Sequence, residues 1–191
     1  ISILLVAVAA GLIAGLVRAL IAGRPFSPPA PRSVWIALIA FLIQYAALNF
    51  EAWYGPANQR VAAFGLTGSL LLLLFFCGQN RTHAAFYWLG AGLLLNLAVI
   101  SLNCGLMPII PETLQQVYPD LPAGAVELGS RVGLSKNVAL AAADTRLEWL
   151  SDRFLLPERL PFQIAYSLGD VLIAIGAFWL LWAAGGERSG Q

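Results

Sequence analysis

The chain has 191 residues, of which 59% are hydrophobic and only 11% are charged, and its formal net charge is +1. Soluble domains usually contain about 25% charged residues. The shortage of charge and the mean hydropathy of +0.77 therefore predict an integral membrane protein. The small net charge gives no sign of the basic face that nucleic-acid binding requires.

Five segments are long enough to cross a membrane, since a transmembrane helix needs about 20 consecutive and mostly apolar residues. We expect the first of them to be a retained helix rather than a signal peptide, because its basic residues, Arg18 and Arg24, come at or after its end. The predicted spans are residues 1–22, 34–53, 61–78, 84–104 and 162–184. We therefore expect an all-α membrane protein, with one transmembrane domain over residues 1–191 built as a bundle of five helices.

The connections between the predicted spans indicate the orientation, because Lys and Arg gather in short cytoplasmic loops. Basic residues are more frequent in the first and third connections and the C-terminal tail than in the second connection: Arg24, Arg32, Arg81 and Arg188 against Arg60. We expect the N-terminus outside, the C-terminus in the cytoplasm and the loop 105–161 outside, in a bacterial plasma membrane. Cys77 and Cys104 would then lie at opposite membrane faces, too far apart for a disulfide.

The long outer loop is predicted to be partly helical. Pro111 in the segment PETLQQV stands at a favourable first position of a helix. Further along, Thr145 and Glu148 have the spacing of a capping box. Apolar residues then recur at helical spacing: Leu147, Leu150 and Phe154. This pattern predicts a short amphipathic helix on the outer surface.

Small residues recur at every fourth position of the first predicted span, among them Gly11, Gly15 and Ala19. The last predicted span has a weaker version that includes Gly169 and Gly176. Small residues at this spacing let another helix approach closely. The partner is either a helix of this chain or a helix of another membrane protein, and the sequence leaves both open.

Polar side chains occur within three predicted spans at matching depth. At 1.5 Å per residue, Asp170, Asn96 and Gln44 lie about 12 to 13 Å from the outer ends of their helices. Further polar residues extend this level toward the outer loop: Gln163, Ser167, Asn103 and Lys136. We predict that Asp170 faces Asn96 or Asn103 and that Lys136 covers the opening. Such a group is either a hydrogen-bonded clamp between helices or a pocket for a proton, a small polar ligand or a quinone headgroup.

Three segments carry a family resemblance: LNCGLMP, SKNVALAAADTRLEWLSDRFLLP and YSLGDVLIAIGAFWL. With them the chain resembles, over nearly its whole length, a family of uncharacterised bacterial membrane proteins defined by a domain of unknown function. The matching positions are Asn103, Gly105, Met107, Pro108, Lys136, Thr145, Asp152, Ser167, Gly169 and Asp170, while Cys104 and Ser151 replace glycines of the pattern. The resemblance implies no activity. It marks a candidate polar group on the outer side that consists of Asn103, Lys136, Asp152 and Asp170.

The sequence has no pattern typical of catalysis or cofactor binding. His83 is the only histidine and lies in a short connection, so no span offers the usual ligand of haem, and no metal-ligand set is evident. We expect an accessory subunit of a larger membrane assembly, for example respiratory or photosynthetic, whose partners are the lipid bilayer and other membrane subunits. The alternative is a small transporter or a ligand-binding membrane protein, for quinone or lipid, that uses the site around Asp170. An enzyme is the class least favoured.

Overall fold

The computed structural model describes residues 2–54, 59–122, 124–157 and 163–186, with backbone alone for residues 50–54. The described part of the chain is predominantly helical. Its α-helices are α1 (Ile3–Ile21), α2 (Val34–Tyr54), α3 (Gln59–Gln79), α4 (Ala85–Leu102), α5 (Pro111–Val117) and α6 (Leu168–Ala184). Three of them, α1, α3 and α4, are long and apolar enough to span a membrane. The apolar stretch of α2 (Val34–Asn49) and helix α6 are shorter.

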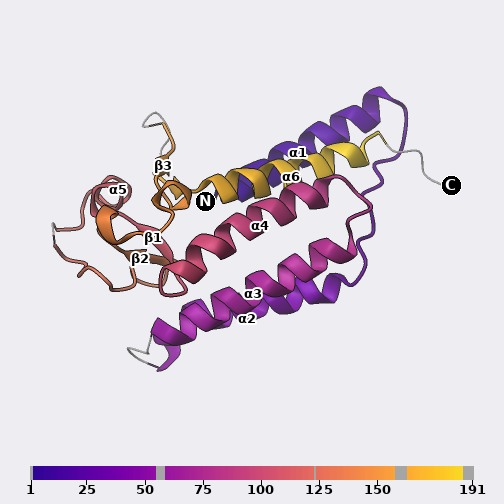
Figure 1. The fold of residues 1–191 in the computed structure, drawn as a ribbon. Coiled ribbons are helices and arrows are strands. Elements are labelled where there is room, and N and C mark those ends of the chain that lie inside the picture. Colours follow the sequence, from indigo (N-terminus) through magenta and orange to yellow (C-terminus); the bar gives the residue numbers. More distant parts are fainter. Residues whose placement is uncertain (1, 55–58, 123, 158–162, 187–191) are drawn as a thin grey trace.

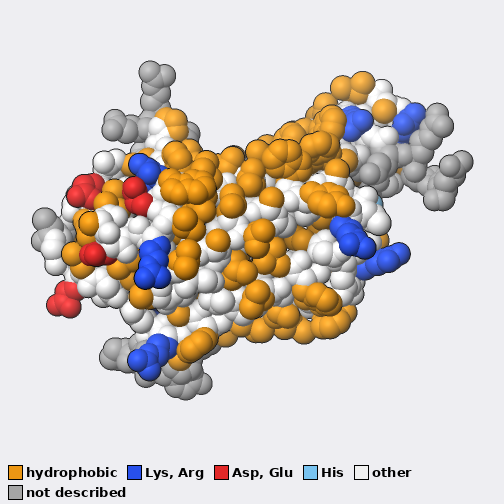
Figure 2. Space-filling view, in the orientation of Figure 1, with side chains coloured by type: hydrophobic (Ala, Val, Ile, Leu, Met, Phe, Trp, Pro, Cys, Tyr) orange, Lys and Arg blue, Asp and Glu red, His pale blue; other side chains and the backbone are white. Residues whose placement is uncertain are grey.

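The long helices lie side by side in a row (Figure 1). Helix α4 occupies the middle, with α6 and then α1 on one side and α3 and then α2 on the other. The hydrophobic core joins α3, α4 and the segment that follows α4, through residues such as Leu66, Ile100 and Met107. On the face seen in Figure 2, hydrophobic side chains are spread along the whole length of the helices.

Helix α6 begins later than predicted, at Leu168 instead of residue 162. Residues Ala165–Tyr166 instead form strand β4, which pairs antiparallel with β3 (Phe154–Leu155). Ser167 then caps the helix: its hydroxyl accepts from the Asp170 backbone N–H at 3.1 Å, and the Asp170 carboxylate accepts from the Ser167 N–H at 3.3 Å. The predicted depth of Asp170 was therefore wrong, because this residue stands in the first turn of the helix.

The small residues of α1 pack against α6 within the chain. A Cβ atom at Gly11 would lie 2.9 Å from the Phe178 Cα, and one at Gly15 would collide with the Leu181 carbonyl. Ala19 continues the same buried face. On its other side, α6 packs closely against α4 at Gly169 and Gly176. Figure 1 shows the two helices side by side. Of the two partners that the sequence left open, the structure shows an internal one.

The segment between α4 and α6 forms a cap over one end of the helices (Figure 1). Strand β1 (Met107–Ile109) pairs parallel with β2 (Asn137–Ala139), and between them α5 begins with Pro111 at its first turn, as predicted. Two short 3₁₀ turns follow, Ala142–Asp144 and Glu148–Leu150. The cap thus consists of two strand pairs, helix α5 and two 3₁₀ turns.

The amphipathic helix predicted after Thr145 is absent from the structure of this segment. The Thr145 hydroxyl donates backward to the Ala141 carbonyl at 2.9 Å, and Leu147 adopts a left-handed φ of 52°. The Asn103 side chain explains the departure, because it donates to the Arg146 carbonyl at 2.8 Å and accepts from the Arg146 N–H at 2.9 Å. The bond to the Arg146 carbonyl takes an acceptor that a helix beginning here would have used.

The close approach of α1 and α6 predicts the effect of adding one methyl group. Gly11→Ala should lower the free energy of unfolding by about 1 to 3 kcal/mol, because its Cβ would meet the Phe178 backbone of α6. Gly68→Ala on α3 is the matched control, since its Cβ would meet no atom within 4 Å. Thermal unfolding in a neutral detergent measures both. Equal stability of the two variants would contradict the tight α1–α6 contact.

Candidate binding site beneath the cap

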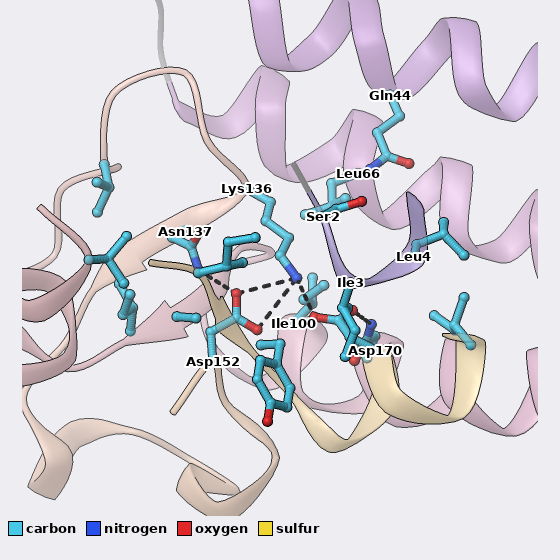
Figure 3. Close-up of a pocket in the computed structure, with 18 of the residues that line it drawn as sticks. Ser2, Ile3, Leu4, Gln44, Leu66, Ile100, Lys136, Asn137, Asp152 and Asp170 are labelled. Carbon is cyan, nitrogen blue, oxygen red and sulfur yellow. Dashed lines mark hydrogen bonds and ion pairs between the residues drawn. The ribbon is translucent and has the colours of Figure 1, made fainter. Parts of the chain in front are cut away.

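A cavity of about 570 Å³ lies where the cap meets the helices. Its walls are mostly apolar and come from α1, α3, α4, α5, α6 and the cap. Leu66, Leu70 and Leu73 line it from α3, Leu93 and Ile100 from α4. The first residues of α1 also border it, and Gln44 reaches it from α2 (Figure 3). Its volume and its largely apolar lining with a few polar groups are typical of small-molecule sites.

One lysine and two carboxylates form the polar end of this cavity (Figure 3). The Lys136 ammonium lies 3.1 Å from Oδ2 of Asp170 and 3.3 Å from Oδ2 of Asp152. Asp170 comes from the first turn of α6, whereas Lys136 and Asp152 both belong to the cap. This cluster therefore ties the cap to the helices by charge-assisted bonds.

Amide groups complete the cluster on both sides. Asn96 of α4 donates to Oδ1 of Asp170 at 2.9 Å and accepts from the Ser167 hydroxyl at 3.0 Å. Asn137 of β2 donates to Oδ2 of Asp152 at 2.8 Å. Asn96, Ser167 and Asp152 are at most 5% exposed. Both carboxylates are thus held by neutral donors as well as by the lysine.

The remaining predicted site residues lie apart from the charged cluster. Gln44 lines the cavity and accepts from the Ser69 hydroxyl at 3.4 Å, while Gln163 lines the cavity from the segment before β4. Asn103 is buried at the end of α4, where it binds the Arg146 backbone instead of Asp170. Arg131, the other basic residue near this end of the cavity, donates to the Leu48 carbonyl at 2.7 Å.

Asn137 is the member of the cluster that sequence reasoning missed, and Asp152 was marked only by the family resemblance. The register of β1 and β2 places Asn137 opposite Met107, and Asp152 is fixed by its N–H, which donates to the Pro108 carbonyl at 3.2 Å. Both contacts depend on strands of three residues whose pairing leaves little pattern in the sequence. The resemblance was the one available signal.

The electrostatics of the cluster favour a charged lysine. Burial alone would lower the pKa of Lys136, but the charges and hydrogen bonds of Asp152 and Asp170 outweigh it and raise that pKa above its usual value. Burial raises the pKa of Asp152 above its usual value, although the Lys136 charge opposes this. Lys136 therefore carries its charge at neutral pH. Within the described residues, no group of three or more His, Cys, Asp or Glu side chains could hold a metal ion.

The raised pKa of Lys136 predicts a loss of stability at alkaline pH. Because the folded pKa exceeds the unfolded value of about 10.4, the contribution is complete below that pH and declines above it, by at most about 1.4 kcal/mol per pH unit. Thermal unfolding between pH 8 and 11.5 measures the decline. Lys136→Met should lack this component of the alkaline decline. An identical alkaline decline in both proteins would contradict the role of the lysine.

Comparison with known proteins gives a family. A family model described as "Family of unknown function (DUF5317)" matches residues 31–182, which includes every member of the charged cluster. No curated protein and no solved structure matches the chain. The match covers more than half of the chain and agrees with the resemblance drawn from its motifs. The chain therefore belongs to this family of unknown function.

Proposed function

We propose that this protein is a membrane-embedded binding protein for an amphiphilic small molecule such as a quinone or a lipid. The observation that carries the proposal is the cavity itself, in which apolar walls from the helices end at the cluster of Lys136, Asp152 and Asp170. An apolar tail would lie along the leucines of α3 and α4. A polar headgroup would meet the charged cluster under the cap.

The packing of the helices supports access from the lipid. Helix α1 packs along α6 and α2 packs along α3, whereas the described residues of α1 and α2 share no extensive contact. Both nevertheless border the cavity, α1 through Ile3, Leu4 and its capping residue Ser2, and α2 through Gln44 (Figure 3). The side of the cavity between α1 and α2 would therefore face the bilayer, from which an amphiphile could enter.

The proposal includes five membrane-spanning helices in a bacterial plasma membrane. Helix α6 has 17 residues, or about 26 Å, which approaches the thickness of a hydrocarbon core. It packs between α1 and α4, which are long enough to span. Helix α2 packs along α3 in the same way. On the face seen in Figure 2, acidic and basic side chains both lie at the cap end, while the coloured charged side chains at the opposite end are basic, which is typical of a cytoplasmic face.

The structure removes one motive for the function first expected from the sequence, an accessory subunit of a larger assembly. That hypothesis used the small residues of α1 as a groove for a foreign helix. Gly11 and Gly15 are instead covered by α6. None of the described residues fills the cavity in the same way, and ligand binding is the function that the geometry supports best.

The orientation can be tested with single cysteines in a chain that carries Cys77→Ala and Cys104→Gly. Asp144→Cys places a thiol on the exposed surface of the cap, and Ala30→Cys places one in the exposed connection between α1 and α2. An impermeant thiol reagent should label position 144 in intact cells and position 30 only after the membrane is opened. The reverse pattern would show that the cap is cytoplasmic.

Ligand binding can be tested by filling the cavity. Leu73→Trp places an indole in its wall, whereas Leu71→Trp places the same group on the face of α3 that is 53% exposed. Three probes with one tail and different headgroups are used: dodecylammonium, dodecanol and dodecanoate. Native mass spectrometry should find at least one probe bound one-to-one to the wild type and Leu71→Trp, and not to Leu73→Trp. Absence of saturable binding by all three, or equal binding to Leu73→Trp, would overturn the proposed function.

A further inference from the structure

The charge of the cluster narrows the class of ligand. Lys136 supplies one positive charge, and Asp152 and Asp170 supply two negative ones when both are ionised. The cluster then has a net charge of −1. An uncompensated charge is costly where the surroundings are largely apolar, so a proton or a second cation is needed to balance it.

Among the described residues that line the cavity, no other ionisable side chain balances this charge. The remaining titratable residues there are Tyr118 after α5 and Tyr166 of β4. The polar lining residues from α1, α2 and α4 are the uncharged Ser2, Gln44 and Asn96. Arg131, next to the lining residue Val132, directs its guanidinium to the carbonyls of Leu48 and Ser135.

The hydrogen bonds around the two carboxylates also favour a cation over an anion in the cavity. The amide donors of Asn96 and Asn137 both point at carboxylate oxygens, and the Lys136 ammonium lies between the same two carboxylates. A carboxylate has about four acceptor positions, and Asp170 receives three donors: Asn96, Lys136 and the backbone of Ser167. The cluster thus retains acceptor capacity while its donors are engaged. An anionic headgroup would meet a site that repels it.

We propose, on the basis of the proposed function, that the cavity takes an amphiphile with a singly charged ammonium headgroup, which replaces a proton carried by one of the two carboxyl groups, Asp152 or Asp170. In this exchange one organic cation enters as one proton leaves to water, so that the charge of the occupied site is unchanged. The headgroup lies against Asp170, whose side chain is 19% exposed and borders the cavity. The alkyl tail follows the leucines of α3 and α4. Burial, which raises the pKa of Asp152, is consistent with a carboxyl group that keeps a proton when no cation is present.

The test compares dodecylammonium and dodecanol on the purified full-length chain in a neutral detergent between pH 5 and 8, where the amine stays protonated. Dodecylammonium should bind more tightly than dodecanol or dodecanoate, and its affinity should rise with pH by up to about tenfold per unit while protons remain to be displaced. Isothermal titration in two buffers of different ionisation enthalpy should show up to one proton released per cation bound. Dodecanol binding should not depend on pH.

Asp170→Asn removes the charge and keeps a side chain of the same shape. It should weaken dodecylammonium binding on the order of tenfold or more and leave dodecanol unchanged. Asp144→Asn, at an exposed position of the cap, is the matched control and should leave both unchanged. If Asp170→Asn does not fold, the pH dependence and proton release of the wild type decide the question.

The outcomes separate this inference from the proposed function. Binding of dodecanol or dodecanoate as tight as that of dodecylammonium, abolished by Leu73→Trp, would overturn the ammonium preference and keep the binding function. Dodecylammonium binding that is independent of pH and releases no proton would overturn the exchange. A lack of binding by every probe would overturn both.

Discussion

The ion pairs of Lys136 with Asp152 and Asp170 are the interaction on which the arrangement of the molecule depends. The pair with Asp170 joins the cap to the first turn of α6, and the pair with Asp152 lies within the cap, where the Asp152 side chain is only 2% exposed. Breaking such a buried pair from one side usually costs about 3 to 5 kcal/mol, since a charge is left without a partner. The pairs therefore fix the position of the cap over the cavity.

The same arrangement can act both as a clamp between helices and as one end of a ligand-binding pocket. The bonds among Asn96, Ser167 and Asp170 hold α4 and α6 together, as a clamp would. The same carboxylate of Asp170 borders a cavity whose walls are leucine and isoleucine side chains. A clamp alone needs no cavity beside it. The combination of a rigid polar end and an apolar chamber is what favours an amphiphilic ligand over a purely structural role.

Much of the helical framework could be predicted from the sequence, because long apolar runs bounded by proline or glycine are strong signals. The start of α6 could not be predicted, because the apolar sequence runs on without a break from the segment before it into the helix. Only the pairing of β4 with β3 shows that this segment is not helical. The 3₁₀ turn at Glu148–Leu150 was missed for a similar reason. Its local pattern is helical, but the Asn103 side chain binds the backbone at Arg146 and overrides it.

The charged cluster was partly predictable. Contact between Asp170 and Asn96 followed from placing polar residues of neighbouring helices at one level, although the depth assigned to Asp170 was wrong. Lys136 was suggested as a partner because a cation is the simplest neighbour for a carboxylate in an apolar environment. Asn137 could not be found in this way, because its contact with Asp152 depends on the register of two three-residue strands.

The most direct test of the account is an experimental structure of the chain in lipid nanodiscs, determined at a resolution that shows bound lipids. The account predicts elongated density in the cavity between α3, α4 and α6, ending within hydrogen-bonding distance of the cluster formed by Lys136, Asp152 and Asp170. A collapsed cavity, with Leu70 and Leu73 of α3 packed directly against Ile173 of α6 and no space for a ligand, would contradict it.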